Sequence, residues 1–280
     1  MDAITDWIEE EDGRCLVVVE ARIAAAAEAV WESVGTGPGY TAWFVPAEVE
    51  PGEGGGVTMH HGSFGDSEGT ITAWDPPRRI SYDEGGWLGE DTPVPPWSTE
   101  VDVEDPGDNA PLVVRLTSGL LEDGPRWREQ ILPTREGWVG AVRMLREYHT
   151  HFAGLPAAQF IVQVEPGGND VVTGVGSLDD GGVPGPVPDL AEAAGLAGVE
   201  AGRPAVTAPG VPPLAGTVIA QDPGSVTLRV DGAGIYEFGT AEFGPTRMLT
   251  VRGYLYGVDA AERAAAEERP WRDWVESLLR

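Results

Sequence analysis

The pattern of apolar and polar residues in the first half of the chain predicts a strand, a short helix and then an antiparallel meander. The run RCLVVVEARI, residues 14–23, is dense in valine and leucine and leads into the alanine-rich stretch AAAAEAVWESV, which favours a strand followed by a helix. Glycines and a proline at residues 35–39 end that helix. Four short segments separated by glycine- or proline-containing turns follow, as is typical of hairpin-connected strands: VPAEVEP, VTMHHGSF, EGTITAWD and RRISYDE.

An amphipathic helix closes this half of the chain. Between Thr134 and Phe152, apolar residues recur at three- and four-residue spacing and form one stripe: Trp138, Val142, Leu145, Tyr148 and Phe152. Before this helix, STEVDVE and LVVRLTSGL continue the sheet, whereas residues 85–97 are rich in glycine and proline and predict an extended loop. The acidic run EEED at residues 9–12 is interpreted as a solvated tail.

The second half of the chain resembles part of the first. Residues 154–213 are dense in glycine, proline and alanine and contain only weak strands, FIVQVEP and PAVTAP, and a short helix near DLAEAAG. Order then returns, and AGTVIAQDPGSVTLR aligns with EGTITAWDPPRRISY at an offset of 147 residues. A helix over residues 259–279 repeats the tryptophan, valine and leucine spacing of the earlier one. We therefore expect two domains, 1–154 and 155–280, the second a degenerate copy of the first.

Five features in order carry a family resemblance over residues 14–153: the first strand running into EAVWESV, then YTAWF, GGGV, GTITAWDPPRRISY and the closing GWVGAVRMLREYH. Together they resemble the SRPBCC (START-like) superfamily, in the branch similar to the activator of the heat-shock-protein-90 ATPase. The resemblance implies an α+β helix-grip fold, in which a curved antiparallel sheet wraps around a long C-terminal helix and leaves an apolar cavity. The family includes ligand carriers, cyclases, hydroxylase subunits and co-chaperones, so the resemblance narrows the fold more than the function.

Charge and cysteine content restrict the partners. The chain has 18 basic residues, all arginine, against 46 acidic ones, and its formal net charge is −28. Such a chain repels phosphate backbones and anionic lipid, so we expect neither nucleic acid nor a membrane as a partner. The single cysteine, Cys15, excludes an intramolecular disulfide. An acidic N-terminus without an apolar segment favours a soluble cytoplasmic protein with no leader.

The sequence contains no recognisable catalytic or metal-binding set. The four histidines are His60, His61, His149 and His151. Neighbours on a strand point to opposite faces, and helical residues two apart diverge, so neither pair converges on one ion. There is no nucleophile elbow, and Cys15 lies in an apolar strand. We expect no metal and no cofactor, and the chain is less readily interpreted as an enzyme than as a binding protein.

Aromatic residues are the richest signal in the first domain. We predict a cavity that binds an apolar or aromatic small molecule, since such sites combine apolar walls with few polar groups. The predicted lining residues are Phe44, Met59, His61, Ile71, Tyr82, Trp97, Trp138 and Val142. His61 would be the titratable group of that cavity, or His60 if the strand register shifts by one. The alternatives are a protein partner, in a co-chaperone-like or regulatory role, and an enzyme of the cyclase or hydrolase type.

Overall fold

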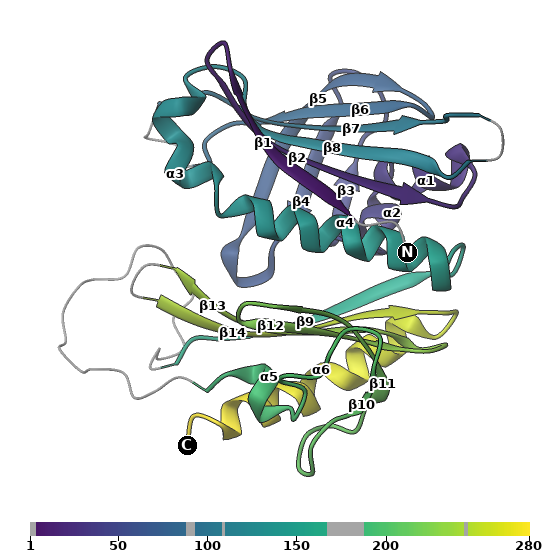
Figure 1. Cartoon of the computed structure of the whole chain (residues 1–280), viewed down its shortest axis with the longest axis vertical. Helices are drawn as coiled ribbons and strands as arrows, with labels where there is room; N and C mark the ends of the chain where they lie inside the picture. Colours follow the sequence, from purple (N-terminus) through teal and green to yellow (C-terminus); the bar gives the residue numbers. More distant parts are fainter. Residues whose placement is uncertain (1–3, 88–92, 108–109, 167–187, 244–245) are drawn as a thin grey trace. The chain divides into compact units, whose positions relative to one another are not determined.

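The computed structural model describes residues 4–87, 93–107, 110–166, 188–243 and 246–280. The chain divides into two compact units, Met1–Leu155 and Pro156–Arg280 (Figure 1). Each unit has its own antiparallel sheet and its own long helix at the C-terminal end. Among the described residues, no helix has the length and apolar character needed to span a membrane.

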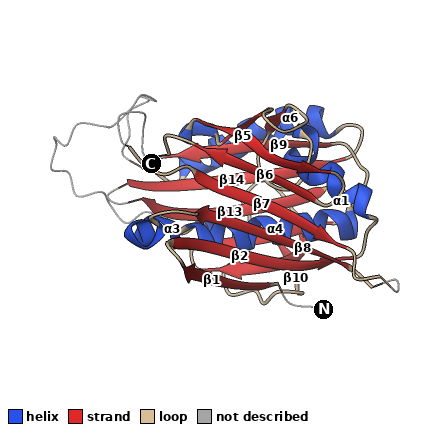
Figure 2. Cartoon of the chain, turned by 90° about the horizontal axis from the view of Figure 1, so that it is seen from above, coloured by secondary structure: helices blue, strands red, loops and turns tan. Residues whose placement is uncertain are grey.

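The first unit is a helix-grip domain, as the sequence predicts. Its curved sheet has the strand order β1-β2-β8-β7-β6-β5-β4-β3, and the long helix α4 (Thr134–His151) packs against it (Figures 1 and 2). The strands are β1 (Thr5–Glu11), β2 (Arg14–Ile23), β3 (Ala47–Val49), β4 (Gly56–His60), β5 (Asp66–Asp75), β6 (Arg79–Glu84), β7 (Trp97–Glu104) and β8 (Leu112–Leu120). The shorter helices are α1 (Ala27–Val34), α2 (Gly37–Thr41), η1 (Gly62–Phe64), η2 (Gly124–Trp127) and α3 (Arg128–Ile131).

Strand pairing defines which side of this sheet faces the helices. Directly paired residues place their side chains on the same face, and Asp6 and Glu10 of β1 pair with Val19 and Cys15 of β2. Asp6 forms an ion pair with Arg135 of α4, and Glu10 forms one with a residue of α3, Arg128. The face that carries these residues is called here the helix-facing side. The pairing extends it across the sheet through Val17, Ser118, Thr99, Tyr82 and Ile71.

Two sequence expectations are corrected or limited by the structure. The acidic run at residues 9–12 is not a solvated tail, because Glu9 and Glu10 lie in β1. Each has a cationic partner that the local pattern could not reveal: Arg14 contacts Glu9, and Arg128 contacts Glu10. In the expected loop at 85–97, residues 85–87 and 93–96 form neither helix nor strand, residues 88–92 lie outside the described residues, and Trp97 begins β7.

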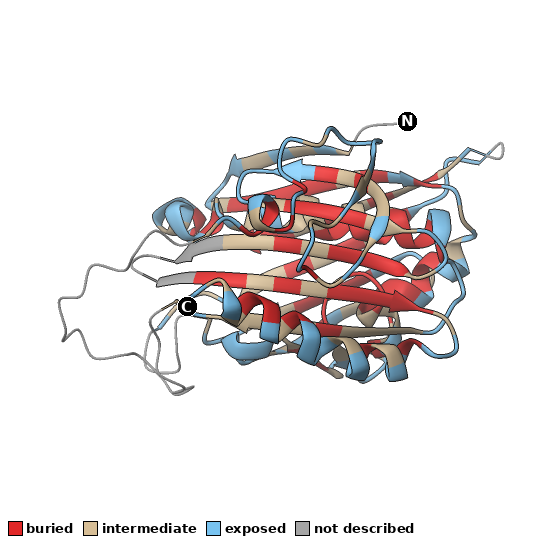
Figure 3. Ribbon diagram, turned by 90° about the horizontal axis from the view of Figure 1, so that it is seen from below, coloured by how far each residue is buried: buried red, intermediate tan, exposed pale blue. Residues whose placement is uncertain are grey.

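The second unit has a sheet of order β10-β11-β12-β13-β14-β9, and the long helix α6 (Ala260–Ser277) packs on β9 and β14. Its interior is filled by apolar side chains, among them Phe160, Phe238, Trp271 and, from the short helix α5 (Leu190–Ala193), Leu190. Buried residues are concentrated on the strands, and exposed residues on the outward turns of the helices (Figure 3). The strands are β9 (Ala157–Val164), β10 (Pro204–Val206), β11 (Ala215–Asp222), β12 (Ser225–Val230), β13 (Gly234–Phe243) and β14 (Thr246–Tyr256).

The aligned segments form the same kind of hairpin in both units. β5 pairs with β6, and β11 pairs with β12. Each hairpin has a register irregularity, between Ile71 and Ala73 in the first and between Val218 and Ala220 in the second. These positions differ by the same 147 residues as the aligned sequences. The sequence similarity therefore extends to a local backbone feature.

Candidate functional site in the first unit

An aromatic group joins α4 to the segment that follows α2. Phe44 stacks on Trp138 with ring centroids 4.9 Å apart, and the ring of His61 meets Phe44 edge-on at 6.1 Å. Phe44 is positioned by a compact turn, because Thr36 caps α2 and the backbone amide of Phe44 donates to the Tyr40 carbonyl. Phe44, His61 and Trp138 all retain partial solvent exposure. Large rings on the inner side of the fold are therefore still accessible.

A second aromatic group lies at the start of β7. Trp87 makes edge contacts with Trp97 at 5.5 Å and with Trp127 at 5.6 Å. The indole of Trp97 donates to the Ser118 hydroxyl at 2.8 Å, which also lies 2.9 Å from the Thr99 hydroxyl. These hydrogen bonds fix the Trp97 ring on the helix-facing side, where it remains half-buried.

Polar side chains lie among these aromatic residues on the helix-facing side. The Nε2 atom of His61 lies 3.2 Å from the hydroxyl of Ser67. Glu84 of β6 is paired with Gly69 on one neighbouring strand and with Trp97 on the other. A Cβ atom at Gly69 would lie 3.1 Å from Cγ of Glu84, so the glycine makes room for the glutamate side chain. The interior polar cluster is defined as Tyr40, His61, Ser67, Tyr82 and Glu84.

The cluster perturbs the acidity of its own members. Burial raises the pKa of the Glu84 carboxyl above its ordinary value, and the Ser67 hydroxyl opposes part of that rise. Burial also raises the pKa of the Tyr40 and Tyr82 hydroxyls, and the Glu84 carboxylate adds to both increases. Tyr40 is 1% exposed, and the Tyr82 hydroxyl is the hydrogen-bonding group that acts on the Tyr40 hydroxyl.

The eight predicted lining residues fall into two groups. Met59, Ile71, Tyr82 and Val142 are buried, with at most 2% exposure. Phe44, His61, Trp97 and Trp138 are partly accessible. The residues that the sequence analysis missed are Tyr40, Ser67, Glu84, Thr99 and Ser118. Alternation in the segment SYDE could have revealed Glu84, because it lies two positions after Tyr82 and shares its face.

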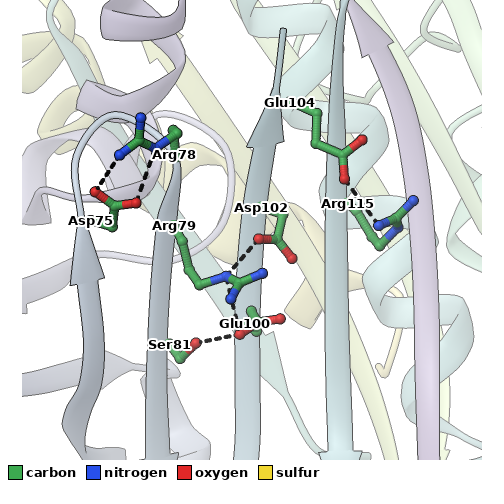
Figure 4. Close-up of polar contacts among 8 residues, drawn as sticks. All are labelled: Asp75, Arg78, Arg79, Ser81, Glu100, Asp102, Glu104 and Arg115. Carbon is green, nitrogen blue, oxygen red and sulfur yellow. Dashed lines mark hydrogen bonds and ion pairs between the residues drawn. The ribbon is translucent and has the colours of Figure 1, made fainter. Parts of the chain in front are cut away.

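The opposite face of the sheet carries a ladder of ion pairs (Figure 4). Arg79 contacts Asp102 at 2.7 Å and Glu100 at 3.5 Å, and the Ser81 hydroxyl donates to Glu100. Arg115 bridges Glu20 and Glu104, and Arg78 pairs with Asp75. Three arginines face five carboxylates in this ladder, so the surface is neutralised only in part and keeps a negative charge.

The histidines are dispersed. His60 pairs with Asp66 at 2.9 Å on the face opposite to His61, His149 contacts Ser33, and His151 lies 3.5 Å from Glu147. Burial raises the pKa of the Cys15 thiol, which favours an unreactive thiol. Among the described residues, no group of three or more His, Cys, Asp or Glu side chains could hold a metal ion.

We therefore expect purified protein to contain no stoichiometric transition metal, because its histidines diverge. Elemental analysis after dialysis tests this. A zinc, iron or copper signal that survives dialysis and disappears in His60→Ala or His61→Ala protein would contradict the expectation.

The comparison with protein families agrees with the fold of the first unit. Residues 24–150 match the family described as activator of Hsp90 ATPase homolog 1-like protein. No curated protein matches the chain. Among solved structures, CalU16 from Micromonospora echinospora is 17% identical over 53% of this chain and 87% of its own, with a TM-score of 0.41. DynU16, from the dynemicin biosynthetic locus, is 14% identical over 96% of this chain and 97% of its own, with a TM-score of 0.42.

Proposed function

We propose that the first unit, whose residues 24–150 belong to the activator of Hsp90 ATPase homolog 1-like family, binds an apolar or aromatic small molecule on its helix-facing side. The observation that carries this proposal is the incomplete burial of Phe44, Trp97 and Trp138 on the inner side of the fold. In a packed core, large aromatic side chains are on average highly buried. Partly accessible rings beside a few polar groups are typical of a site that encloses an apolar ligand.

The second unit provides an internal comparison. The aromatic residues of its apolar cluster are at most 7% exposed: Phe160, Tyr236, Phe238, Trp271 and Trp274. Residues of α5 complete that cluster. The difference in burial supports a binding site in the first unit in preference to the second.

Binding should depend on the Phe44–Trp138 stack. We expect Trp138→Ala to weaken binding of an apolar aromatic ligand by about tenfold or more, since burial contributes about 25 cal/mol per Å² of apolar surface. Tryptophan emission and isothermal titration calorimetry with a panel of apolar ligands measure this. Trp7→Ala is the matched control, because Trp7 is 37% exposed and lies on the opposite face of the sheet.

The proposal fails if the panel leaves tryptophan emission, melting temperature and heat unchanged in the native protein. It also fails if Trp7→Ala weakens binding as much as Trp138→Ala does. Failure to bind any ligand would favour the alternative of a protein partner, which is suggested by the family description alone.

A further inference from the structure

We infer that the ligand of the first unit carries a neutral hydrogen-bond acceptor, a carbonyl oxygen, on its aromatic framework, and that the indole N–H of Trp127 donates to this oxygen. The inference rests on the proposed function and specifies the ligand class of the same site. It comes from the second aromatic group, Trp87, Trp97 and Trp127, in which one of the three indole donors has no partner among the described residues.

The three tryptophans of this group come together from separate segments of the first unit. Trp87 follows β6, Trp97 begins β7, and Trp127 ends η2. The Trp87 ring meets the other two rings edge-on, with interplanar angles of 73° to Trp97 and 82° to Trp127. All three residues are half-buried. The group therefore combines accessible apolar ring surface with three polar N–H groups.

Two of these N–H groups have acceptors within the chain, and the third has none among the described residues. An indole N–H is a donor only, so each ring requires an acceptor. Trp87 donates to the Pro95 carbonyl at 2.8 Å, and Trp97 donates to the Ser118 hydroxyl at 2.8 Å. The Nε1 atom of Trp127 is buried and lacks such a partner. Because buried polar atoms nearly always have a partner, this donor beside accessible rings supports an acceptor on a bound molecule.

The charges around Trp127 favour a neutral acceptor over an anion. Arg126 lies over the Trp127 ring, 5.0 Å from its centroid, and is also paired with Asp123 at 3.8 Å. That arginine therefore already has a carboxylate partner. The chain has a formal net charge of −28, which disfavours the approach of an anionic ligand. A carbonyl oxygen accepts the hydrogen bond from Trp127 without adding a charge.

The test compares two planar probes of similar shape, 2-acetylnaphthalene and 2-isopropenylnaphthalene, by calorimetry with the full chain. The second probe has a methylene group in place of the carbonyl oxygen. Trp127→Phe keeps an aromatic ring but removes the donor. We expect this variant to lower the affinity for the ketone, relative to that for the alkene, by about tenfold, because the carbonyl then loses its hydrogen bond.

Trp97→Phe is the matched control, since it removes an indole N–H that Ser118 already accepts. The ratio of the two affinities should then stay within about twofold of its native value, even if both affinities fall. A second measurement uses native protein alone. In nuclear magnetic resonance spectra, the ketone should slow the exchange of the Trp127 indole proton with water and shift its resonance, whereas the alkene should do so much less.

An equal affinity ratio in native and Trp127→Phe protein would overturn the inference and leave the proposed function standing, with water as the partner of Trp127. Binding of both probes with the same effect on the Trp127 indole proton would also overturn it, and this result does not depend on the folding of a variant. Tighter binding of 2-naphthoate than of 2-acetylnaphthalene would overturn the choice of a neutral acceptor. If no apolar probe binds, the proposed function fails as well.

Discussion

A fragment of residues 1–155 is expected to fold cooperatively when it is produced alone. It contains the complete eight-stranded sheet and the α4 helix that packs on β2. Its core is built from side chains of both, including Val17, Leu116 and Leu145, each at most 1% exposed. We expect a single denaturant transition with a free energy of unfolding of about 5–15 kcal/mol, the ordinary range for such domains. Circular dichroism in a urea series measures it.

The complementary fragment, residues 156–280, should unfold at a lower urea concentration. Its sheet has six strands, and α5, which completes its core, spans only Leu190–Ala193. Less buried surface gives a smaller free energy of unfolding. An unfolded first fragment beside a cooperative second one would overturn this division into domains.

The sequence predicted the fold of the first unit because its signals are local. The apolar stripe of α4 has a helical period, and the meander strands are bounded by glycine and proline. β1 escaped prediction because its acidic residues obtain cationic partners from distant positions. Arg128 and Arg135 lie more than 100 residues from Glu10 and Asp6.

The candidate site was harder to predict than the fold. The aromatic part could be suggested from composition, and Phe44 and Trp138 do meet across the fold. The polar part depends on pairing between strands, because Ser67, Glu84 and Tyr40 come from β5, β6 and α2. The register of those strands, together with the absence of a side chain at Gly69, places Ser67 and Glu84 on the same face of the sheet.

We infer that the second unit is a degenerate copy of the first. The order β9-β14-β13-β12-β11-β10 reproduces β2-β8-β7-β6-β5-β4, and both units end in a long helix. Val218 is the counterpart of Ile71. Val218 is paired with Leu228, whereas Ile71 is paired with Tyr82. Two residues later, Val230 corresponds to Glu84. The second copy therefore replaces both polar residues by apolar ones, which agrees with its filled core.

A buried histidine should make the stability of the first unit depend on pH. His149 of α4 is 8% exposed, its Nε2 atom lies 3.0 Å from the Ser33 hydroxyl, and its Nδ1 atom has no partner among the described residues. Burial lowers the pKa of His149 from 6.5 to about 4. The folded state therefore holds the neutral imidazole, whereas the unfolded chain takes up a proton at a higher pH.

The contribution of His149 to stability is present in full above pH 6.5 and is lost as the pH falls toward 4, because only the unfolded state gains a proton in that window. The loss should reach about 3 kcal/mol, since each pH unit between the two pKa values contributes about 1.4 kcal/mol. His149→Gln keeps a polar group near Ser33 but does not titrate, so the difference in unfolding free energy between native and variant protein should change by that amount between pH 7 and pH 4. Urea melts at a series of pH values measure it. His60→Gln is the matched control, because the His60 side chain is 36% exposed. The prediction is contradicted if the stability of the native protein and that of His149→Gln depend on pH in the same way, because the His149 imidazole would then take up its proton in the folded state.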